Sequence, residues 1–307
     1  MAAVSRLWGQ APEDWTTLAA KGLKAARPLT AQTDHGPEFT RELVEVCWRD
    51  GDPIYLYILT PKNVIKPSVV IYLYNYATGT EQFLNDEFCR ILIKDGVAAV
   101  GFAPALSGQR YHDRPMAQWF VSELQESLGS TVHDVQMILD YLASRGDLDM
   151  RHVGVFGDGS GGAVAVLAAV ADARIRAIDL LDPWGDWPHW LAQSRVVPDE
   201  ERPKFLKEDF LAKVARLDPV GWLPQLKIPI RMEYLRDDGA TPFESIEAMK
   251  RAAPPQALLL AREPALAEYR ATRGAKFLDW IKIQLKTEPP SVSLKTTSNE
   301  IMRSQEK

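Results

Sequence analysis

A glycine-rich turn at residues 157–161, with the sequence Gly-Asp-Gly-Ser-Gly, has the spacing in this chain that is most typical of catalysis. It follows a short apolar run and precedes a stretch of small residues. In such a strand–turn–helix, a Gly-x-Ser-x-Gly pattern presents a nucleophilic serine, and the next backbone N–H helps to bind the oxyanion of an acyl-transfer reaction. Gly159 stands at the central position here, so the serine of that pattern is absent.

Ser160 is the nearest hydroxyl, one position later. A shift of one residue turns a side chain by roughly 100° about a helix axis, away from the place of a substrate carbonyl. We therefore expect Ser160 to be a small polar residue in the first helical turn. The alternative, that Ser160 is the nucleophile, stays open. Asp158 is displaced in the other direction, and an aspartate nucleophile is favoured still less.

A serine nucleophile also needs a base and an acid. Asp238 lies in the turn after the apolar run 228–235, where it is either an acid, as the family resemblance described below implies, or equally a solvated turn aspartate paired to Arg236. General-base activation needs a group with a pKa near neutrality within hydrogen-bond reach. The last 118 residues contain no histidine, and of the five histidines in the chain only His189, in the segment 183–227, could reach the turn. A surface or packing role is the favoured interpretation of His189.

Four other residues could line a ligand-binding cleft. Asn75 and Tyr76 end the apolar run 68–75 and begin the following loop, and Trp184 and Trp187 lie in a tryptophan- and proline-rich segment. Aromatic side chains there could bind an aromatic or glycan ligand. The alternative, which we favour for the tryptophans, is that they pack this segment onto the rest of the protein.

A metal site and a cofactor are not expected. Asp182, Asp186 and His189 form a nominal ligand set, but they lack a fourth ligand and a helical context. The glycine-rich turn is explained by the sharp turn from strand to helix described above, which we call the elbow. We therefore predict no metal and no cofactor.

The elements that must position these residues alternate along the chain. Apolar runs of strand length alternate with stretches of helical spacing, which predicts an α/β fold with a mostly parallel, eight-stranded open sheet and helices on both faces. The predicted strands are 39–48, 53–61, 68–75, 97–104, 152–157, 175–181, 228–235 and 256–261. The predicted helices are 80–96, 130–146, 161–171, 243–253 and 265–285, with Ser130 capping the second and Gly146 ending it.

Segments outside this alternation divide the chain. We predict an N-terminal helical arm at 1–36, with a helix over 12–25, and a main domain at 37–286. Residues 183–227 interrupt the alternation and predict a cap insertion over the strand ends. The polar tail at 287–307 is expected to be disordered.

Composition excludes several classes of protein. Of the 307 residues, 46% are hydrophobic, which suits a globular protein with a large core, and the net charge is −5. That charge argues against a nucleic-acid partner, because phosphate binding requires a basic excess. No apolar run is long enough to cross a membrane. A soluble protein is expected, with the cytoplasm as the default location and a removed signal peptide as the alternative; the oligomeric state is left open.

The turn and the motifs around it resemble the α/β-hydrolase fold superfamily over about residues 38–286. The similarity is to the acetyl-xylan-esterase and dienelactone-hydrolase-like branch. The motifs that carry it are Ser107-Gly108-Gln109-Arg110, Leu128-Gly129 before His133-Asp134, Asp147-Leu148-Asp149, the elbow itself, and Asp172-Ala173-Arg174-Ile175. The resemblance implies that Gly159 occupies the nucleophile position and Asp238 that of the remnant acid. It implies a catalytic histidine in or just beyond 262–266, where the chain has none, and a glycine where Tyr76 stands.

These substitutions set the functional expectation. Loss of the serine or the histidine of a serine hydrolase costs on the order of a million-fold in turnover. We therefore predict a relative of carboxylic-ester hydrolases that lacks serine-hydrolase activity and keeps a pocket for a small-molecule ligand or a partner. The alternatives are an esterase-type hydrolase that uses Ser160 or a rearranged base, a lyase or cyclase that uses Asp238 or His189 in the same pocket, and a purely structural protein. Whether the chain is an enzyme stays open.

Overall fold

A nine-stranded sheet forms the centre of the computed structural model, which describes residues 13–76, 78–107, 110, 120–236, 239–265 and 278–286. The strand order is β1-β2-β3-β5-β4-β6-β7-β8-β9. The bounds are β1 Leu29–His35, β2 Phe39–Val46, β3 Ile54–Pro61, β4 Ser68–Leu73, β5 Ala98–Gly101, β6 Asp149–Asp158, β7 Ile175–Leu181, β8 Ile230–Arg236 and β9 Leu258–Ala265. Strands β1, β2 and β3 pair antiparallel, as do β3 and β5, and the pairs from β5 to β9 are parallel. The prediction of a mostly parallel α/β sheet is confirmed.

The predicted number of strands is wrong by one, because β1 was not recognised. Its sequence, LTAQTDH, has no apolar face, and almost every residue in it is exposed. An edge strand that covers no core does not need the alternation of apolar and polar residues by which a half-buried strand is detected. Strand β1 is instead held by its antiparallel pairing with β2.

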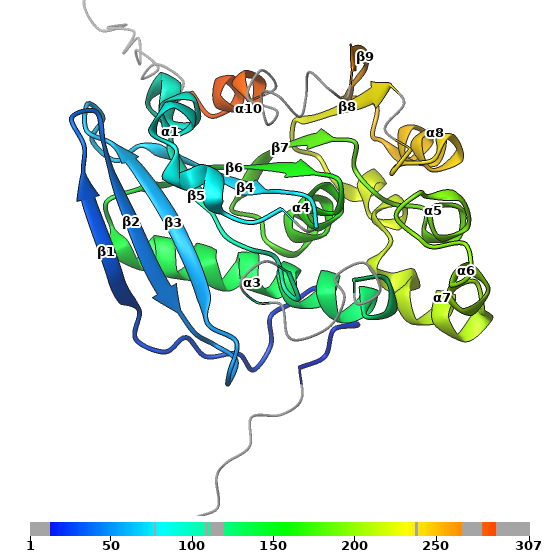
Figure 1. Cartoon of the computed structure of the whole chain (residues 1–307). Coiled ribbons are helices and arrows are strands. Elements are labelled where there is room, and N and C mark those ends of the chain that lie inside the picture. Colours follow the sequence, from blue (N-terminus) through cyan, green and yellow to red (C-terminus); the bar gives the residue numbers. More distant parts are fainter. Residues whose placement is uncertain are drawn as a thin grey trace, which may run out of the picture.

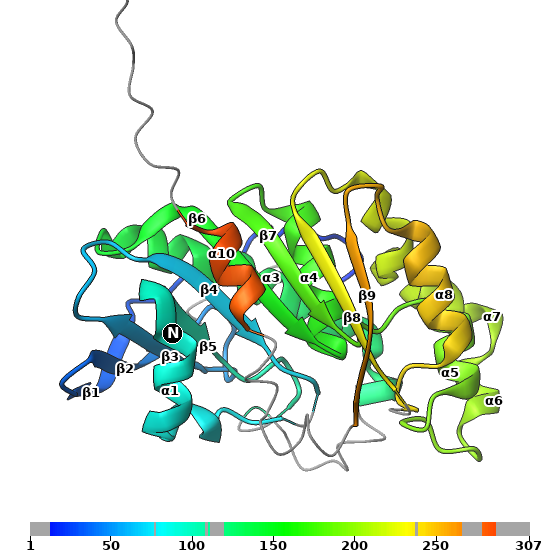
Figure 2. The same ribbon diagram turned by 90° about the horizontal axis from the view of Figure 1, so that it is seen from above.

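Helices cover both faces of the sheet, as predicted (Figure 1). Helices α3 (Leu124–Arg145) and α4 (Ser160–Ala171) pack on one face, and α1 (Asp86–Ile93) and α10 (Asp279–Gln284) lie on the other, which Figure 2 shows from above. Each face has its own apolar cluster, one centred on α3 and α4 and one on α1 and α10. The sheet is therefore buried between two helical layers, which suits its near-continuous apolar strands.

Several predicted helix ends differ from the structure. Helix α3 begins at Leu124, so Ser130 lies in its interior and is not a cap, whereas Gly146 ends the helix in the left-handed conformation, as predicted. The predicted helix 80–96 is three pieces, η1 (Glu81–Leu84), α1 and η2 (Lys94–Gly96). It is interrupted at Asn85, whose side chain accepts a hydrogen bond from the Phe88 N–H at 3.0 Å and so caps α1.

The predicted helix over 12–25 is wrong for the residues that the structure describes, because 13–28 form turns and extended chain. Contacts with α3 decide this conformation. Trp15 packs directly on Gly129, and the His133 Nε2–H donates to the carbonyl oxygen of Thr17 at 2.8 Å. Arg49 and His133 both bind the carboxylate of Glu13. These tertiary contacts outweigh the weak helical preference of the segment. The domain boundary at residue 36 remains a prediction.

The segment between β7 and β8 contains only short helices. They are α5 (Trp187–Gln193), α6 (Arg202–Phe205), α7 (Glu208–Val214), η4 (Ala215–Leu217), η5 (Pro219–Gly221) and η6 (Leu223–Gln225). They pack against α3 and against α8 (Phe243–Ala252), to one side of the sheet in Figure 1. This is the segment predicted as a cap insertion; its assignment as a separate cap stays a prediction. The predicted tail at 287–307 and most of the predicted helix 265–285 lie outside the described residues. Within the described residues, none of the helices is both long and apolar enough to span a bilayer.

Candidate functional site

The glycine-rich turn joins the carboxyl end of β6 to α4. Strand β6 ends at Asp158, Gly159 adopts φ 55° and ψ −114°, and α4 begins at Ser160. The structure therefore places Gly159 at the tip of the turn, as the spacing predicts. A positive φ with this ψ strains any residue with a side chain. The Gly159 N–H donates to the carbonyl of Leu181 at 2.9 Å, and its own carbonyl accepts from Trp184 N–H at 3.0 Å.

The helix approaches the sheet closely at this point. A Cβ atom at Gly161 would lie 2.1 Å from the carbonyl oxygen of Leu73 in β4. No side chain fits at that distance, so the close contact between α4 and β4 requires glycine. This packing fixes the first turn of α4 against the loop that follows β4.

The side chain of Asn75 fills the space next to Gly159. A Cβ atom at position 159 would lie 2.6, 2.7 and 2.8 Å from the Cγ, Oδ1 and Nδ2 atoms of Asn75. A serine at this position would therefore collide with the Asn75 amide. The position at which the sequence pattern predicts a nucleophile is occupied by a side chain from a different loop.

Ser160 is tied to the same loop by three hydrogen bonds. Its Oγ accepts from the Tyr76 N–H at 2.7 Å and donates to Asn75 Oδ1 at 3.2 Å, and its backbone N–H donates to Asn75 Oδ1 at 3.3 Å. Its exposed fraction is 4%. We call Asn75, Tyr76 and Ser160 the elbow cluster. Among the described residues, no titratable side chain hydrogen bonds to Ser160 Oγ, so no base stands ready to take its proton.

Aromatic rings extend from the elbow cluster into the segment after β7. The Tyr76 ring stacks on Phe120 with ring centroids 4.2 Å apart, and Phe120 meets Trp184 edge-on at 5.6 Å. The ring centroids of Trp184 and Trp190 are 4.5 Å apart, and those of Trp190 and Trp187 are 5.7 Å apart. Trp184 and Trp187 are each 1% exposed. In this structure they pack the segment into the core, which is the favoured alternative of the sequence analysis, and a ligand does not reach them without displacing a neighbour.

Comparison with known proteins shows which folds this chain resembles. Residues 54–180 match the family model of the dienelactone hydrolase family. The fold is similar to an acetyl xylan esterase from Paenibacillus sp. R4, with a TM-score of 0.65 and 17% identity over 83% of this chain and 89% of that one. An acetyl xylan esterase from Thermoanaerobacterium sp. JW/SL YS485 gives a TM-score of 0.62 and 13% identity over 86% and 89% of the two chains. No curated protein matches the sequence. The chain therefore has the α/β-hydrolase fold.

The α/β-hydrolase fold gives the elbow cluster a chemical meaning. In this fold, the oxyanion hole consists of the backbone N–H after the nucleophile and an N–H from a loop that follows an earlier strand. The corresponding donors here are the N–H groups of Ser160 and Tyr76. Both are occupied by the chain itself, the first by Asn75 Oδ1 and the second by Ser160 Oγ. The amide oxygen of Asn75 thus accepts a hydrogen bond from the N–H of the residue that follows the tip of the turn.

His189, the predicted base, does not join the elbow cluster in the part of the chain that the structure describes. His189 lies on α5 with 54% of its side chain exposed, and its Nδ1 pairs with Asp186 Oδ2 at 2.7 Å. This is the surface role favoured for it. Asp238 lies outside the described residues, so its position relative to Gly159 stays a prediction. The described residues contain no group of three or more histidine, cysteine, aspartate or glutamate side chains that could hold a metal ion.

Two carboxylates in this region have structural roles. Asp182 Oδ1 accepts from the Leu235 N–H at 2.8 Å and links the ends of β7 and β8. Asp218 accepts from the backbone N–H groups of Asp186, Trp187 and Val220 and fixes the start of α5. Burial raises the pKa of Asp218 although these three donors lower it. Sequence analysis missed Asp218 and Phe120, because neither lies in a recognisable motif.

Proposed function

We propose that this α/β-hydrolase-fold protein does not carry out serine-hydrolase chemistry and that its elbow is a binding site in a closed state. One observation carries the proposal: the Asn75 amide fills the place of the nucleophile side chain and accepts the hydrogen bond of an oxyanion donor. A substrate acyl group would compete with this amide for the same space.

The chemistry of the elbow supports this proposal. Ser160 is buried and hydrogen-bonded to Tyr76 and Asn75, and neither partner is a base at neutral pH. An unactivated serine hydroxyl is a weak nucleophile. Together with the absence of histidine after His189, this arrangement predicts a turnover lower by about a million-fold than that of an intact triad.

The same arrangement supports binding. Rotation of Asn75 away from Ser160 breaks two hydrogen bonds of 3.2–3.3 Å, each with a net contribution of about 1 kcal/mol. It exposes the N–H of Ser160 at the start of α4, where the helix dipole favours a negative oxygen. A ligand carboxylate forms charge-assisted hydrogen bonds there and replaces the amide oxygen. The ligand class is thus a small molecule, or a segment of a partner, that presents a carboxylate or carbonyl oxygen.

The catalytic half of the proposal is tested with a fluorophosphonate and with p-nitrophenyl acetate. We expect no labelling and no ester hydrolysis above that of Ser160→Ala. Labelling or turnover that disappears in Ser160→Ala would contradict the proposal and support an active hydrolase that uses Ser160.

The binding half is tested by thermal melting with benzoate as the carboxylate probe. Asn75→Ala removes the competing amide, so benzoate should raise its melting temperature more than that of the wild type. Asn63→Ala is the matched control, because Asn63 is exposed and lies away from the elbow cluster. An equal benzoate effect on Asn75→Ala, Asn63→Ala and the wild type would show that the elbow does not bind carboxylates.

A further inference from the structure

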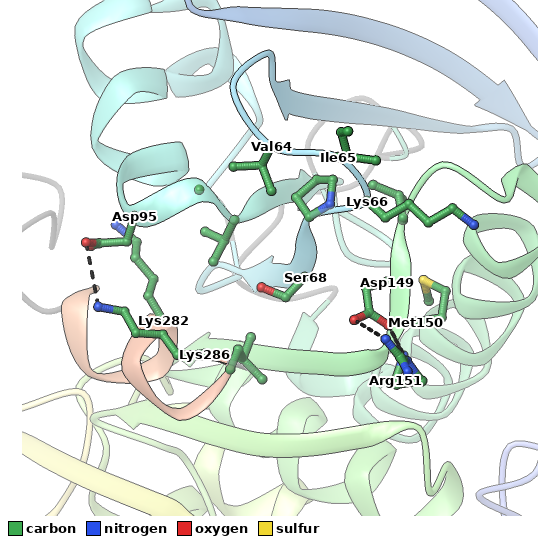
Figure 3. A pocket seen from close by; sticks show the side chains of 15 residues that line it. Val64, Ile65, Lys66, Ser68, Asp95, Asp149, Met150, Arg151, Lys282 and Lys286 are labelled. Atoms are coloured by element: carbon green, nitrogen blue, oxygen red, sulfur yellow. Dashed lines mark hydrogen bonds and ion pairs between the residues drawn. The ribbon is translucent and has the colours of Figure 1, made fainter. Parts of the chain in front are cut away.

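A cavity of about 830 Å³ lies at the edge of the sheet opposite the elbow. It is formed where β4, β5 and β6 begin, by the loop before β4, the turn before β5, the start of β6 and the end of α10 (Figure 3). Asp149 and Asp158 are the two ends of β6, so roughly 30 Å of strand separates this cavity from Gly159. We call it the amino-edge cavity. It is independent of the elbow cluster and of the function proposed above.

The charge of the cavity wall is opposite in sign to that of the whole chain. The lining contains four cationic side chains, those of Lys66, Arg151, Lys282 and Lys286, and two carboxylates. The chain as a whole carries −5. A concave surface with an excess of one charge focuses its field and attracts ligands of the opposite charge. The wall is therefore suited to an anion although the protein repels anions at long range.

One carboxylate of the wall is already fully engaged. Asp149 binds Arg151 at 2.9 Å and His152 at 2.8 Å, and the hydrogen bond from Arg151 leads the interactions that keep the pKa of Asp149 far below its usual value. Asp149 therefore stays ionised and committed to its neighbours. It does not compete for the remaining lysines.

The remaining cations have weak partners or none among the described residues. Lys286 Nζ is 4.0 Å from Asp95 Oδ1, at the limit of an ion pair, and its side chain is 59% exposed. Lys66 is exposed, and its charge acts on the carboxylate of Asp147, but no ion pair within 4.0 Å joins it to a described residue. Lys282 differs, because its buried amine donates to the carbonyl of Ile91 at 2.5 Å and so braces the wall. Lys66 and Lys286 are thus available to a ligand.

Figure 3 shows these two lysines on opposite sides of the cavity, with Ser68 between them. The hydroxyl of Ser68, which also lines the cavity, is a further hydrogen-bond donor. The floor between the charged sides is apolar. It consists of Val64, Pro67, Val97, Leu148, Met150 and Leu285. Polar groups at the rim over an apolar floor are the usual composition of a small-molecule site of this volume.

We propose that the amino-edge cavity binds a small organic anion, whose apolar body lies on the floor and whose phosphate or carboxylate group binds Lys66 or Lys286 at the rim. A bare inorganic anion uses only the charges, and a neutral molecule uses only the floor. The organic anion contacts both the charged side chains and the apolar floor, so it should bind more tightly than an inorganic anion or a neutral molecule.

Phenyl phosphate is the first probe, measured by calorimetric titration of the full chain. We expect a dissociation constant of about 1 mM or lower, with inorganic phosphate and benzyl alcohol each binding at least tenfold more weakly and benzylammonium not binding. Benzoate in place of phenyl phosphate shows whether the wall prefers a carboxylate or a phosphate. No heat of binding for either organic anion up to about 10 mM would overturn the proposal.

Variants locate the binding. Lys66→Gln with Lys286→Gln should weaken phenyl phosphate binding at least tenfold, because both available cations are lost. Lys21→Gln with Lys24→Gln is the matched control, since it removes two exposed lysines elsewhere and should leave binding within twofold. Ser160→Ala should also leave it unchanged, which separates this site from the elbow. An equal loss in the control pair, or a loss in Ser160→Ala alone, would overturn the proposal.

Discussion

The two edges of the central sheet are built in opposite ways. At the carboxyl edge, the polar groups of Asn75, Tyr76 and Ser160 satisfy one another, and the space above Gly159 is filled. At the amino edge, a cavity remains open, and Lys66 and Lys286 lack strong partners among the described residues. Enzymes with this fold have their catalytic residues at the carboxyl edge of the sheet. Here that edge is closed by the chain itself, and the open, charged surface is on the other side.

This contrast shows that a fold can keep the geometry of a site while its donors are redirected. The strained Gly159 and the close approach of α4 to β4 are present, and each needs glycine for steric reasons. The N–H groups of Ser160 and Tyr76, which we propose as the counterparts of oxyanion donors, are also present but are internally bonded. In the function that we propose, this elbow differs from a catalytic one in the acceptor to which those donors are bonded.

The largest effect is expected from alanine at the glycine that holds the elbow in place. Gly161→Ala puts a Cβ atom 2.1 Å from the carbonyl oxygen of Leu73, which is backbone and cannot move aside. We expect a loss of about 3 kcal/mol or more in the free energy of unfolding, measured by urea denaturation.

Alanine at two further glycines allows the cost at the carboxyl edge of the sheet to be compared with the cost elsewhere. Gly96→Ala at the amino-edge cavity meets only the Val64 side chain, at 2.8 Å, and adds strain at a positive φ, so its cost should be smaller. Gly221→Ala meets nothing within 4 Å and should be close to neutral. An equal cost at Gly161 and Gly96 would show that the elbow is not the more rigid edge.

The next effect is the pH dependence of stability that arises from Glu13, in the N-terminal segment that packs on α3. Burial raises the pKa of Glu13, but hydrogen bonds and charges of Arg49 and His133 outweigh it and lower the pKa to about 2. A carboxylate whose pKa is lowered by folding stabilises the folded state at pH values above its unfolded pKa of 4.5. This contribution is lost as the pH falls toward 2.

Glu13→Gln should therefore destabilise the protein by on the order of 2 kcal/mol at pH 7, and the difference from wild type should shrink as the pH falls from about 4.5 to 2. Thermal melting across this pH range measures it. The reactivity of the elbow should not change. A difference that is constant with pH would show that Glu13 is not held as an ionised group.

A smaller effect is expected when the nucleophile position is refilled. Gly159→Ser strains the backbone and collides with Asn75, which should cost about 1–3 kcal/mol. Adding Asn75→Gly removes the collision but not the strain, so the double variant should be more stable than the sum of the two single changes predicts. Additive effects in urea denaturation would mean that Asn75 does not fill the serine position.

The smallest effect is expected for the lysines of the amino-edge cavity. Lys66→Gln with Lys286→Gln should change the free energy of unfolding by less than about 0.5 kcal/mol, because exposed charges with distant partners contribute little. A loss above about 1 kcal/mol would show that these lysines stabilise the fold and are not free for a ligand.

Local patterns in the sequence predicted much of the fold. The apolar runs that became β4, β6 and β7 and the glycine spacing that placed Gly159 at the tip are properties of neighbouring residues. Strand β1 has no such pattern, because it is an exposed edge. The missed turns at 13–28 depend on contacts with Gly129 and His133, far along the chain.

The internal state of the site could not be predicted in the same way. Asn75 and Tyr76 were candidates for ligand contact, but their bonds to Ser160 join residues 84 and 85 positions apart. No local spacing encodes such a pairing. The amino-edge cavity also collects its lysines from separate segments, the loop before β4 and the end of α10, which no motif connects.

Amide hydrogen exchange at Ser160 and Tyr76, resolved by NMR, tests the central claim most directly, because it reports whether the oxyanion donors are internally bonded. In the wild type both amides should exchange slowly. Asn75→Ala should speed exchange at Ser160, and Ser160→Ala should speed it at Tyr76, each at least tenfold, with Asn63→Ala unchanged. Exchange at both amides that is as fast in the wild type as in these variants would contradict a closed elbow.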